Sequence, residues 1–104
     1  MKRNIAVVTG GYSGEAVISL QSAEQVIKHL DAEKYTCYKI ILTKEKWVLS
    51  QDGKDFPVDK NDFSATLGGK KLKFDCAFIA LHGTPGEDGK LQGYFDMIGM
   101  PYTS

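Results

Sequence analysis

The fold is decided by the stretch Asn4-Ile5-Ala6-Val7-Val8-Thr9-Gly10-Gly11 near the amino terminus. Its apolar, β-branched residues predict a buried first strand, and the two glycines predict a sharp turn directly after it. From residue 17 to residue 30, apolar side chains recur at helical spacing, which predicts a helix with one stripe packed on the sheet. The chain is therefore expected to begin as a strand, a glycine turn and a helix.

Two further apolar runs, residues 35–43 and 74–81, predict the second and third main strands. Between them, the short runs on either side of Asp52-Gly53 predict a surface hairpin. The polar residues 61–73 contain Gly68-Gly69 and are expected to form a mobile loop.

Apolar residues at helical spacing predict a last helix over 91–98, with Asp88 as its N-cap and Gly99 as its stop. The order of all these elements predicts an α/β fold. We expect a three-layer, open, mainly parallel sheet whose three main strands lie in the order 2-1-3. Helices should cover both faces, with the hairpin at one side.

Size and composition restrict the class of protein. A chain of 104 residues with 42% hydrophobic and 25% charged residues is expected to form one globular domain over 1–104. Thirteen basic residues balance thirteen acidic ones without a basic patch, so a nucleic-acid partner is not expected. No apolar run is long enough to cross a bilayer. Cys37 and Cys76 fall in apolar strands without metal-ligand spacing and are expected to be unbonded, which fits a reducing cytoplasm.

Two glycine-rich loops follow the carboxyl ends of predicted strands: residues 10–15 after the first strand and residues 82–89 after the third. Ligands of open α/β sheets bind at that edge, where the strand order reverses. In a 2-1-3 order the two loops border one crevice. Glu15 and His82 would then face a common ligand.

Each of these features also has a purely structural interpretation. The glycine pair can simply join a strand to a helix, Glu15 can be a favourable partner of the helix dipole, and His82 can be a hydrogen-bonded histidine at a strand end. The first loop is not G-x-G-x-x-G, and the second strand ends without a clear ribose-binding acid, so a dinucleotide site is disfavoured.

The two loops together resemble those of the D-alanine:D-alanine ligases. The first similarity lies in Gly10-Gly11-Tyr12-Ser13-Gly14-Glu15 and Ser19-Leu20. The second, longer similarity lies in Ala80-Leu81-His82-Gly83, Gly86-Glu87-Asp88-Gly89, Leu91-Gln92-Gly93 and Gly99-Met100-Pro101-Tyr102-Thr103. Only the middle of the chain is unmatched, so the resemblance covers the whole chain.

The resemblance implies an ATP-grasp ligase of the bacterial cytoplasm that makes D-alanyl-D-alanine for peptidoglycan. ATP and magnesium would bind in two later domains that this sequence lacks, so no cofactor or metal is expected here. Glu15 would hold the ammonium group of the first D-alanine, and His82 would lie beside its carboxylate; Ile18 and Gly83 would also contact the substrate. The resemblance also allows a homodimer of the full-length enzyme.

Two other interpretations remain open at this point. One is a free-standing flavodoxin-like module that binds a small anion or a nucleotide at the Gly10 loop. The other is the first domain of a different ATP-grasp enzyme, which would share the fold but should lack the run from His82 to Gly93. The sequence downstream of Ser104 would distinguish them, because a ligase continues into a lysine-bearing ATP-grasp domain.

Overall fold

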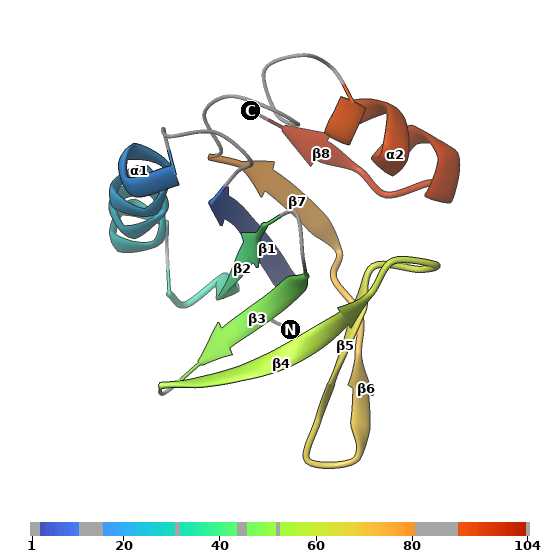
Figure 1. The fold of residues 1–104 in the computed structure, drawn as a ribbon. Helices are drawn as coiled ribbons and strands as arrows, with labels where there is room; N and C mark the ends of the chain where they lie inside the picture. Colours follow the sequence, from blue (N-terminus) through green and yellow to red (C-terminus); the bar gives the residue numbers. More distant parts are fainter. Residues whose placement is uncertain are drawn as a thin grey trace.

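The chain folds around one sheet, which Figure 1 shows with helices beside it. The computed structural model describes residues 3–10, 16–30, 32–43, 46–51, 53–80 and 90–103; in the two helices, side chains are described from Ala23 and from Leu91 onward. The described elements are, in chain order, β1 (Arg3–Gly10), α1 (Ala16–His29), β2 (Tyr35–Leu42), β3 (Trp47–Gln51), β4 (Lys54–Asp59), β5 (Ser64–Leu67), β6 (Lys70–Leu72), β7 (Cys76–Ile79), α2 (Lys90–Ile98) and β8 (Tyr102–Thr103). The prediction of an α/β fold, with helices packed beside a sheet, is confirmed.

The strand order is β6-β5-β4-β3-β2-β1-β7-β8. Strand β1 pairs in parallel with β2 on one side and with β7 on the other, and β8 pairs in parallel with β7. The register places Ile5 opposite both Cys37 and Cys76, so the two cysteines lie on strands separated by β1. Both thiols are free, as predicted.

The expectation of a mainly parallel sheet is wrong, because every pairing from β2 to β6 is antiparallel. The hairpin β3–β4 is part of the sheet rather than a surface appendage, and its Trp47, Leu49 and Val58 side chains are buried. Its turn lies between the paired residues Gln51 and Lys54, as predicted, and Gly53 in that turn has a φ of +76°. Buried alternate side chains explain why β3 and β4 belong to the core.

Residues 61–73 do not form the predicted mobile loop. They contain β5 and β6, which are joined by Gly68 and Gly69 with φ values of +57° and +82°. Two successive residues with positive φ are typical of a tight hairpin turn, so the glycine pair marks a turn between strands rather than a loop. Phe63 and Ala65 from this segment are fully or almost fully buried.

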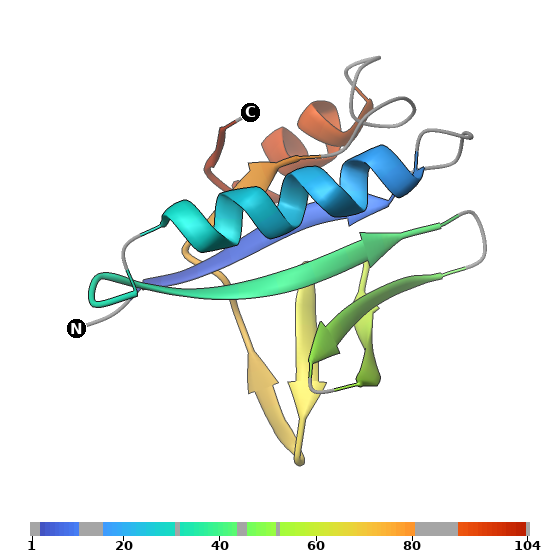
Figure 2. The ribbon, with the colours of Figure 1, turned by 90° about the vertical axis from the view of Figure 1, so that its left-hand side faces the viewer.

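The sheet has a separate apolar cluster on each face. Side chains of β1 alternate between them: Ile5 and Val7 pack with Ala23 of α1, whereas Ala6 and Val8 belong to the cluster that contains Leu91 and Phe95 of α2. Figures 1 and 2 show α1 and α2 on opposite sides of β1 and β7, with β3 to β6 curling beneath. The sheet is therefore curled where an open sheet was expected, and its antiparallel half shares a core with α2.

Phe63 lies at the centre of the larger cluster. Its ring centroid is 5.0 Å from that of Phe95, 5.7 Å from that of Phe74 and 6.1 Å from that of Trp47. The Tyr94 hydroxyl donates a hydrogen bond of 2.6 Å to the carbonyl of Lys60, in the turn before Phe63. Helix α2 is thus fixed to the antiparallel half by aromatic contacts, which contribute about 0.5–1.5 kcal/mol each beyond burial.

Helix α2 ends where the sequence predicts. Gly99 has a φ of +74°, and its N–H donates to the carbonyl of Asp96 at 3.3 Å. The N–H of Met100 donates to the carbonyl of Phe95 at 2.9 Å. This pair of bonds is the Schellman motif, in which glycine supplies the left-handed residue, and it turns the chain into β8.

Candidate functional site

The edge formed by the carboxyl ends of β1 and β7 is the candidate site. The two strands are parallel neighbours in register from Ile5 opposite Cys76 to Val8 opposite Ile79, and the N–H of Ala80 donates to the carbonyl of Val8 at 2.9 Å. Residues 11–15 follow β1 and residues 81–89 follow Ala80. Both loops identified from the sequence therefore leave from adjacent strands at one edge.

Both helices continue from these loops. Only residues 11–15 separate the end of β1 from the start of α1, and residues 81–89 separate Ala80 from the start of α2. Figure 2 shows α1 beginning at the arrowhead end of β1 and running back along the sheet. The amino terminus of α1 is thus at the candidate edge, where its unpaired N–H groups and dipole favour a negative charge.

The close approach of β1 to β2 explains why a glycine stands at the end of β1. Gly10 has a φ of +92°, and a Cβ atom on it would lie 2.6 Å from the carbonyl oxygen of Leu42 on the neighbouring strand β2. A contact this short with backbone cannot be relieved by a side-chain rotation. Gly10 is therefore required by the close packing of β1 on β2, whatever the loop after it binds.

The residues predicted to contact a ligand lie beyond what the structure describes. Glu15, His82 and Gly83 fall outside the described residues, and so does the proposed N-cap Asp88. The backbone of Ile18 belongs to the first turn of α1, but its side chain is also outside the described set. The structure therefore places at one edge the ends of β1 and β7 and the start of α1, next to which these residues follow in sequence.

One polar group at this edge was not singled out from the sequence. Thr9 is fully buried, and within the described part of the chain its hydroxyl has no hydrogen-bond partner. It follows Ile5 and Val7 at alternate positions of β1, so its side chain points toward the α1 face. The available signal was a hydroxyl residue at the end of an apolar run, directly before the glycine pair.

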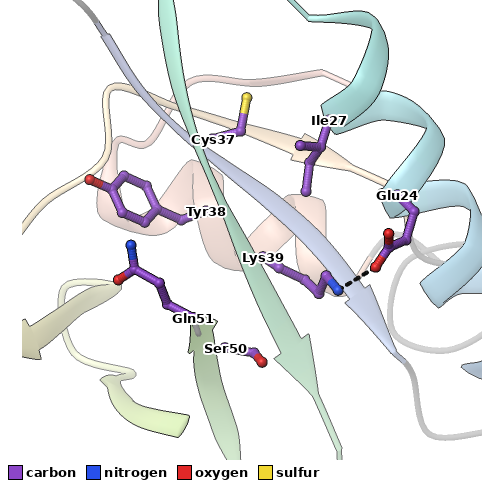
Figure 3. Close-up of a pocket in the computed structure, with 7 residues that line it drawn as sticks. All are labelled: Glu24, Ile27, Cys37, Tyr38, Lys39, Ser50 and Gln51. Carbon is purple, nitrogen blue, oxygen red and sulfur yellow. Dashed lines mark hydrogen bonds and ion pairs between the residues drawn. The ribbon is translucent and has the colours of Figure 1, made fainter. Parts of the chain in front are cut away.

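A hollow of about 300 Å³ lies elsewhere, between α1 and strands β2 and β3. In Figure 3 the Lys39 side chain points toward Glu24 of α1, and Lys39 Nζ is 2.6 Å from Glu24 Oε1. The hydrogen bond and charge of Lys39 lower the pKa of Glu24. Because Glu24 is largely exposed, this is a surface ion pair between α1 and β2, and such pairs contribute little stability.

The described residues include neither a membrane-spanning helix nor a metal-binding cluster. No helix among them is long and apolar enough to span a membrane. Within the same residues, no group of three or more histidine, cysteine, aspartate or glutamate side chains is placed to hold a metal ion.

An α/β domain with two glycine-containing loops at one sheet edge is typical of a ligand-binding domain. Comparison with known proteins makes this specific, because residues 4–104 match the family model described as the D-ala D-ala ligase N-terminus. The chain belongs to this family.

Individual relatives agree with the family match. The D-alanine--D-alanine ligase of Parabacteroides distasonis is 54% identical over 105 aligned residues, which cover 100% of this chain and 32% of that protein. The chain spans about a third of the length of the curated relatives it matches.

Solved structures of the family have the same fold. The D-alanine-D-alanine ligase from Coxiella burnetii superposes with a TM-score of 0.83 at 31% identity, covering 97% of this chain and 34% of that one. The D-alanine--D-alanine ligase from Bacillus anthracis, complexed with ATP, has a TM-score of 0.65 at 30% identity, covering 97% of this chain and 29% of that one.

Proposed function

We propose that residues 1–104 are the N-terminal domain of an ATP-dependent ligase that joins two D-alanines into D-alanyl-D-alanine for peptidoglycan, and that this domain supplies the first D-alanine subsite. The observation that carries the proposal is the family match over residues 4–104. The strand pairing supports it, because the loops before α1 and after Ala80 leave from neighbouring parallel strands and so border one edge.

Four residues would form the subsite. Glu15, directly before α1, would hold the ammonium group of the first D-alanine, and His82 would lie beside its carboxylate. A carboxylate at a helix amino terminus stays ionised, and its hydrogen bond to an ammonium group is charge-assisted. An imidazole donor is suited to stabilise negative charge that grows on the substrate carboxylate during reaction. Ile18, in the first turn of α1, and Gly83 would complete the contacts.

ATP and magnesium would be held by the remainder of the enzyme. The relatives are about three times as long as this chain, and one of the similar solved structures is an ATP complex. Central and C-terminal ATP-grasp domains would carry both groups. These would supply the phosphoryl group that activates the first substrate. This chain would bind and orient that substrate and exclude water from one side.

The setting of the enzyme follows from the same proposal. The ligase would work in the bacterial cytoplasm, supply the cell wall that maintains cell shape, and take D-alanine as its small-molecule partner, with a homodimer as its assembly. The free-standing flavodoxin-like module is not favoured, because the match extends over the family's own N-terminal domain and not merely over a shared fold.

The function of Glu15 can be tested in the full-length ligase with Glu15→Gln. The neutral amide keeps the shape but loses a charge-assisted hydrogen bond of about 1.5–3 kcal/mol, so kcat/KM for the first D-alanine should fall by about ten- to a hundredfold. The KM for ATP should change far less. Glu24→Gln is the matched control, because Glu24 lies on α1, the helix that follows Glu15, but pairs with Lys39. An unchanged kcat/KM for D-alanine together with weaker ATP binding would show that Glu15 has another role.

His82 should act mainly on the chemical step. A donor that meets charge only as it develops stabilises the transition state more than the ground state, so His82→Ala should lower kcat more than it raises KM. Steady-state kinetics with D-alanine as the varied substrate would show the difference. Thermal unfolding provides the second measurement: a strongly lowered Tm with normal turnover of the folded enzyme would make His82 a structural residue instead.

A further inference from the structure

Two hydroxyl side chains are buried in the described part of the chain, and they differ in their hydrogen bonding. Ser64 is 2% exposed, and its Oγ donates a hydrogen bond of 2.6 Å to Asp62. Thr9 is fully buried, and its Oγ1 has no partner among the described residues. Replacing such an unpartnered hydroxyl by an apolar group of the same shape is nearly neutral or stabilising. The packing of the free chain therefore does not explain why position 9 is threonine rather than valine.

The strands beside Thr9 offer its hydroxyl no partner. On β2 the residue opposite Thr9 is Ile41. On the other side, the N–H of Ala80 already donates to the carbonyl of Val8, and the Ala80 side chain belongs to the apolar cluster beneath α1. For the described residues, a partner of the Thr9 hydroxyl therefore has to come from α1.

Thr9 lies beneath the first turn of α1. Ala23 packs with Val7 on this face of the sheet, and α1 runs back along β1 (Figure 2). Ser19 precedes Ala23 by one helical turn, about 5.4 Å, on the same face of the helix. Thr9 follows Val7 by about 6.6 Å on the same face of the strand. Both steps lead toward the candidate edge, so the Thr9 hydroxyl faces the backbone of the first turn.

The N–H groups of this first turn need acceptors. The first four N–H groups of an α-helix have no acceptor within the helix, and the first turn of α1 contains no acidic residue. Glu15 stands directly before the helix in the sequence, where a carboxylate favours the positive end of the helix dipole. In the proposed function, however, this carboxylate holds the ammonium group of the first D-alanine. Binding of D-alanine would therefore withdraw a negative charge from the start of α1.

We propose that Thr9 is a positioning residue of the first D-alanine subsite: its hydroxyl accepts a hydrogen bond from an N–H of the first turn of α1 once D-alanine has engaged Glu15. This inference rests on the proposed function. Because the hydroxyl has no partner in the empty domain, the new bond stabilises the substrate-bound state relative to the free one. Thr9 is fully buried and acts through the start of α1, which follows Glu15 and carries Ile18.

Thr9→Val in the full-length ligase removes the hydroxyl and keeps the shape of the side chain. The KM for the first D-alanine should rise by about two- to tenfold, as expected for one hydrogen bond, while kcat and the KM for ATP change by less than about twofold. The Tm of the substrate-free enzyme should be unchanged or higher, because no bond is lost there. At a fixed D-alanine concentration, the rise in Tm should be smaller than in the unmodified ligase.

Two further variants separate the hydroxyl from the packing around it. Thr9→Ser keeps the hydroxyl but loses a buried methyl group, so the Tm should fall while the KM for the first D-alanine stays within about twofold of normal. Ser64→Ala is the control, because it removes a buried hydroxyl that already has a partner in the empty domain. It should lower the Tm without changing the kinetics. Opposite responses of KM and Tm in the two Thr9 variants are not expected for a residue that only fills space.

Three results would overturn the inference. The first is an unchanged KM for D-alanine in Thr9→Val. The second is an equal increase of this KM in Thr9→Val and Thr9→Ser, which would assign the effect to packing. The third is a substrate-free Thr9→Val enzyme that is unfolded or melts at a lower temperature, because the hydroxyl would then have a partner before D-alanine binds. All three leave the proposed function standing, which fails separately if the unmodified ligase does not join D-alanine or if Glu15→Gln leaves the D-alanine kinetics unchanged.

Discussion

At the scale of single residues, the end of β1 combines two adjacent residues with different constraints. Gly10 cannot carry a side chain, because the carbonyl of Leu42 occupies the space. Thr9 carries a buried hydroxyl that is unpartnered within the described residues. A buried hydroxyl without a hydrogen-bond partner lowers the free energy of unfolding by about 1–3 kcal/mol. Thr9 carries this hydroxyl at the edge where the candidate subsite begins.

Replacing Gly10 tests the packing explanation. Gly10→Ala should lower the free energy of unfolding by at least about 2 kcal/mol, because it combines a left-handed backbone with a clash against β2. Gly53→Ala is the control: Gly53 also has a positive φ, but no atom lies within 4 Å of its added Cβ, so it should lose only about 1 kcal/mol. Denaturant unfolding of the two variants gives the comparison. Equal losses would mean that the contact with Leu42 is unimportant.

At the scale of elements, local sequence signals predict a helix, strand or turn well where the residues of that segment alone determine its conformation. The first strand, both helices, the turn at Asp52-Gly53 and the stop at Gly99 were all predicted, because glycine placement and helical spacing are local properties. Residues 61–73 were misjudged for the opposite reason. Phe63 and Ala65 are buried only because α2 and β4 pack against them, and such contacts leave no trace in a short polar window.

The position of the candidate site could be predicted from the sequence, but the roles of its residues could not. The placement of both loops at one edge follows from the strand order, which the pattern of apolar runs suggested. The roles of Glu15 and His82 came from resemblance, since a lone carboxylate or histidine next to glycines is chemically ambiguous. Thr9 was missed because a single hydroxyl in a strand is ordinarily satisfied by a neighbour, and only coordinates show whether it is.

The segment before β5 should behave as core rather than loop. Phe63→Ala should cost about 3–5 kcal/mol, as expected for removal of a fully buried aromatic ring. Phe63→Leu keeps most of the volume and should lose clearly less, which allows the comparison even if the alanine variant is unfolded at 25 °C. Phe56→Ala, at a half-buried position on β4, provides the control. A loss at position 63 no larger than that at position 56 would contradict a central role for this ring.

The β5–β6 hairpin also predicts a pH dependence. Asp62 is held 2.5 Å from Lys71 Nζ and accepts a 2.6 Å hydrogen bond from Ser64, which together lower its pKa from 3.8 to about 2. A lowered pKa in the folded state means that the stabilisation is complete above pH 4 and is lost as the pH falls toward 2. The Lys71 pKa is raised by the same contact, so its share persists until alkaline pH.

Asp62→Asn should therefore destabilise the chain at neutral pH, and the difference from the unmodified chain should shrink between pH 4 and pH 2. Urea unfolding across this range measures it. Asp55→Asn, a change at an exposed position on β4, is the control for removing one negative charge. A difference that stays constant with pH would show that the ion pair does not stabilise the hairpin.

At the scale of the whole molecule, the proposed subsite would form only one side of a ligase active site. We expect the isolated 104-residue chain to show neither ATP hydrolysis nor ligation, and to bind D-alanine no more tightly than about millimolar. Polar groups facing water on an open edge act in a high dielectric and gain little from orientation. Isothermal titration calorimetry with D-alanine and with ATP tests both statements. Tight nucleotide binding would instead support the free-standing module.

The pairing of β1 with β7 also has a consequence for how the protein is made. Asn4 donates its N–H to the carboxylate of Asp75, 71 residues further along the chain. The antiparallel strands between them can pair locally as they leave the ribosome, but their apolar face needs Phe95 of α2 to close over Phe63. Loop closure over such distances is slow, and exposed strands are prone to association in the meantime. We therefore expect the nascent chain to expose this aromatic face until α2 has been synthesised.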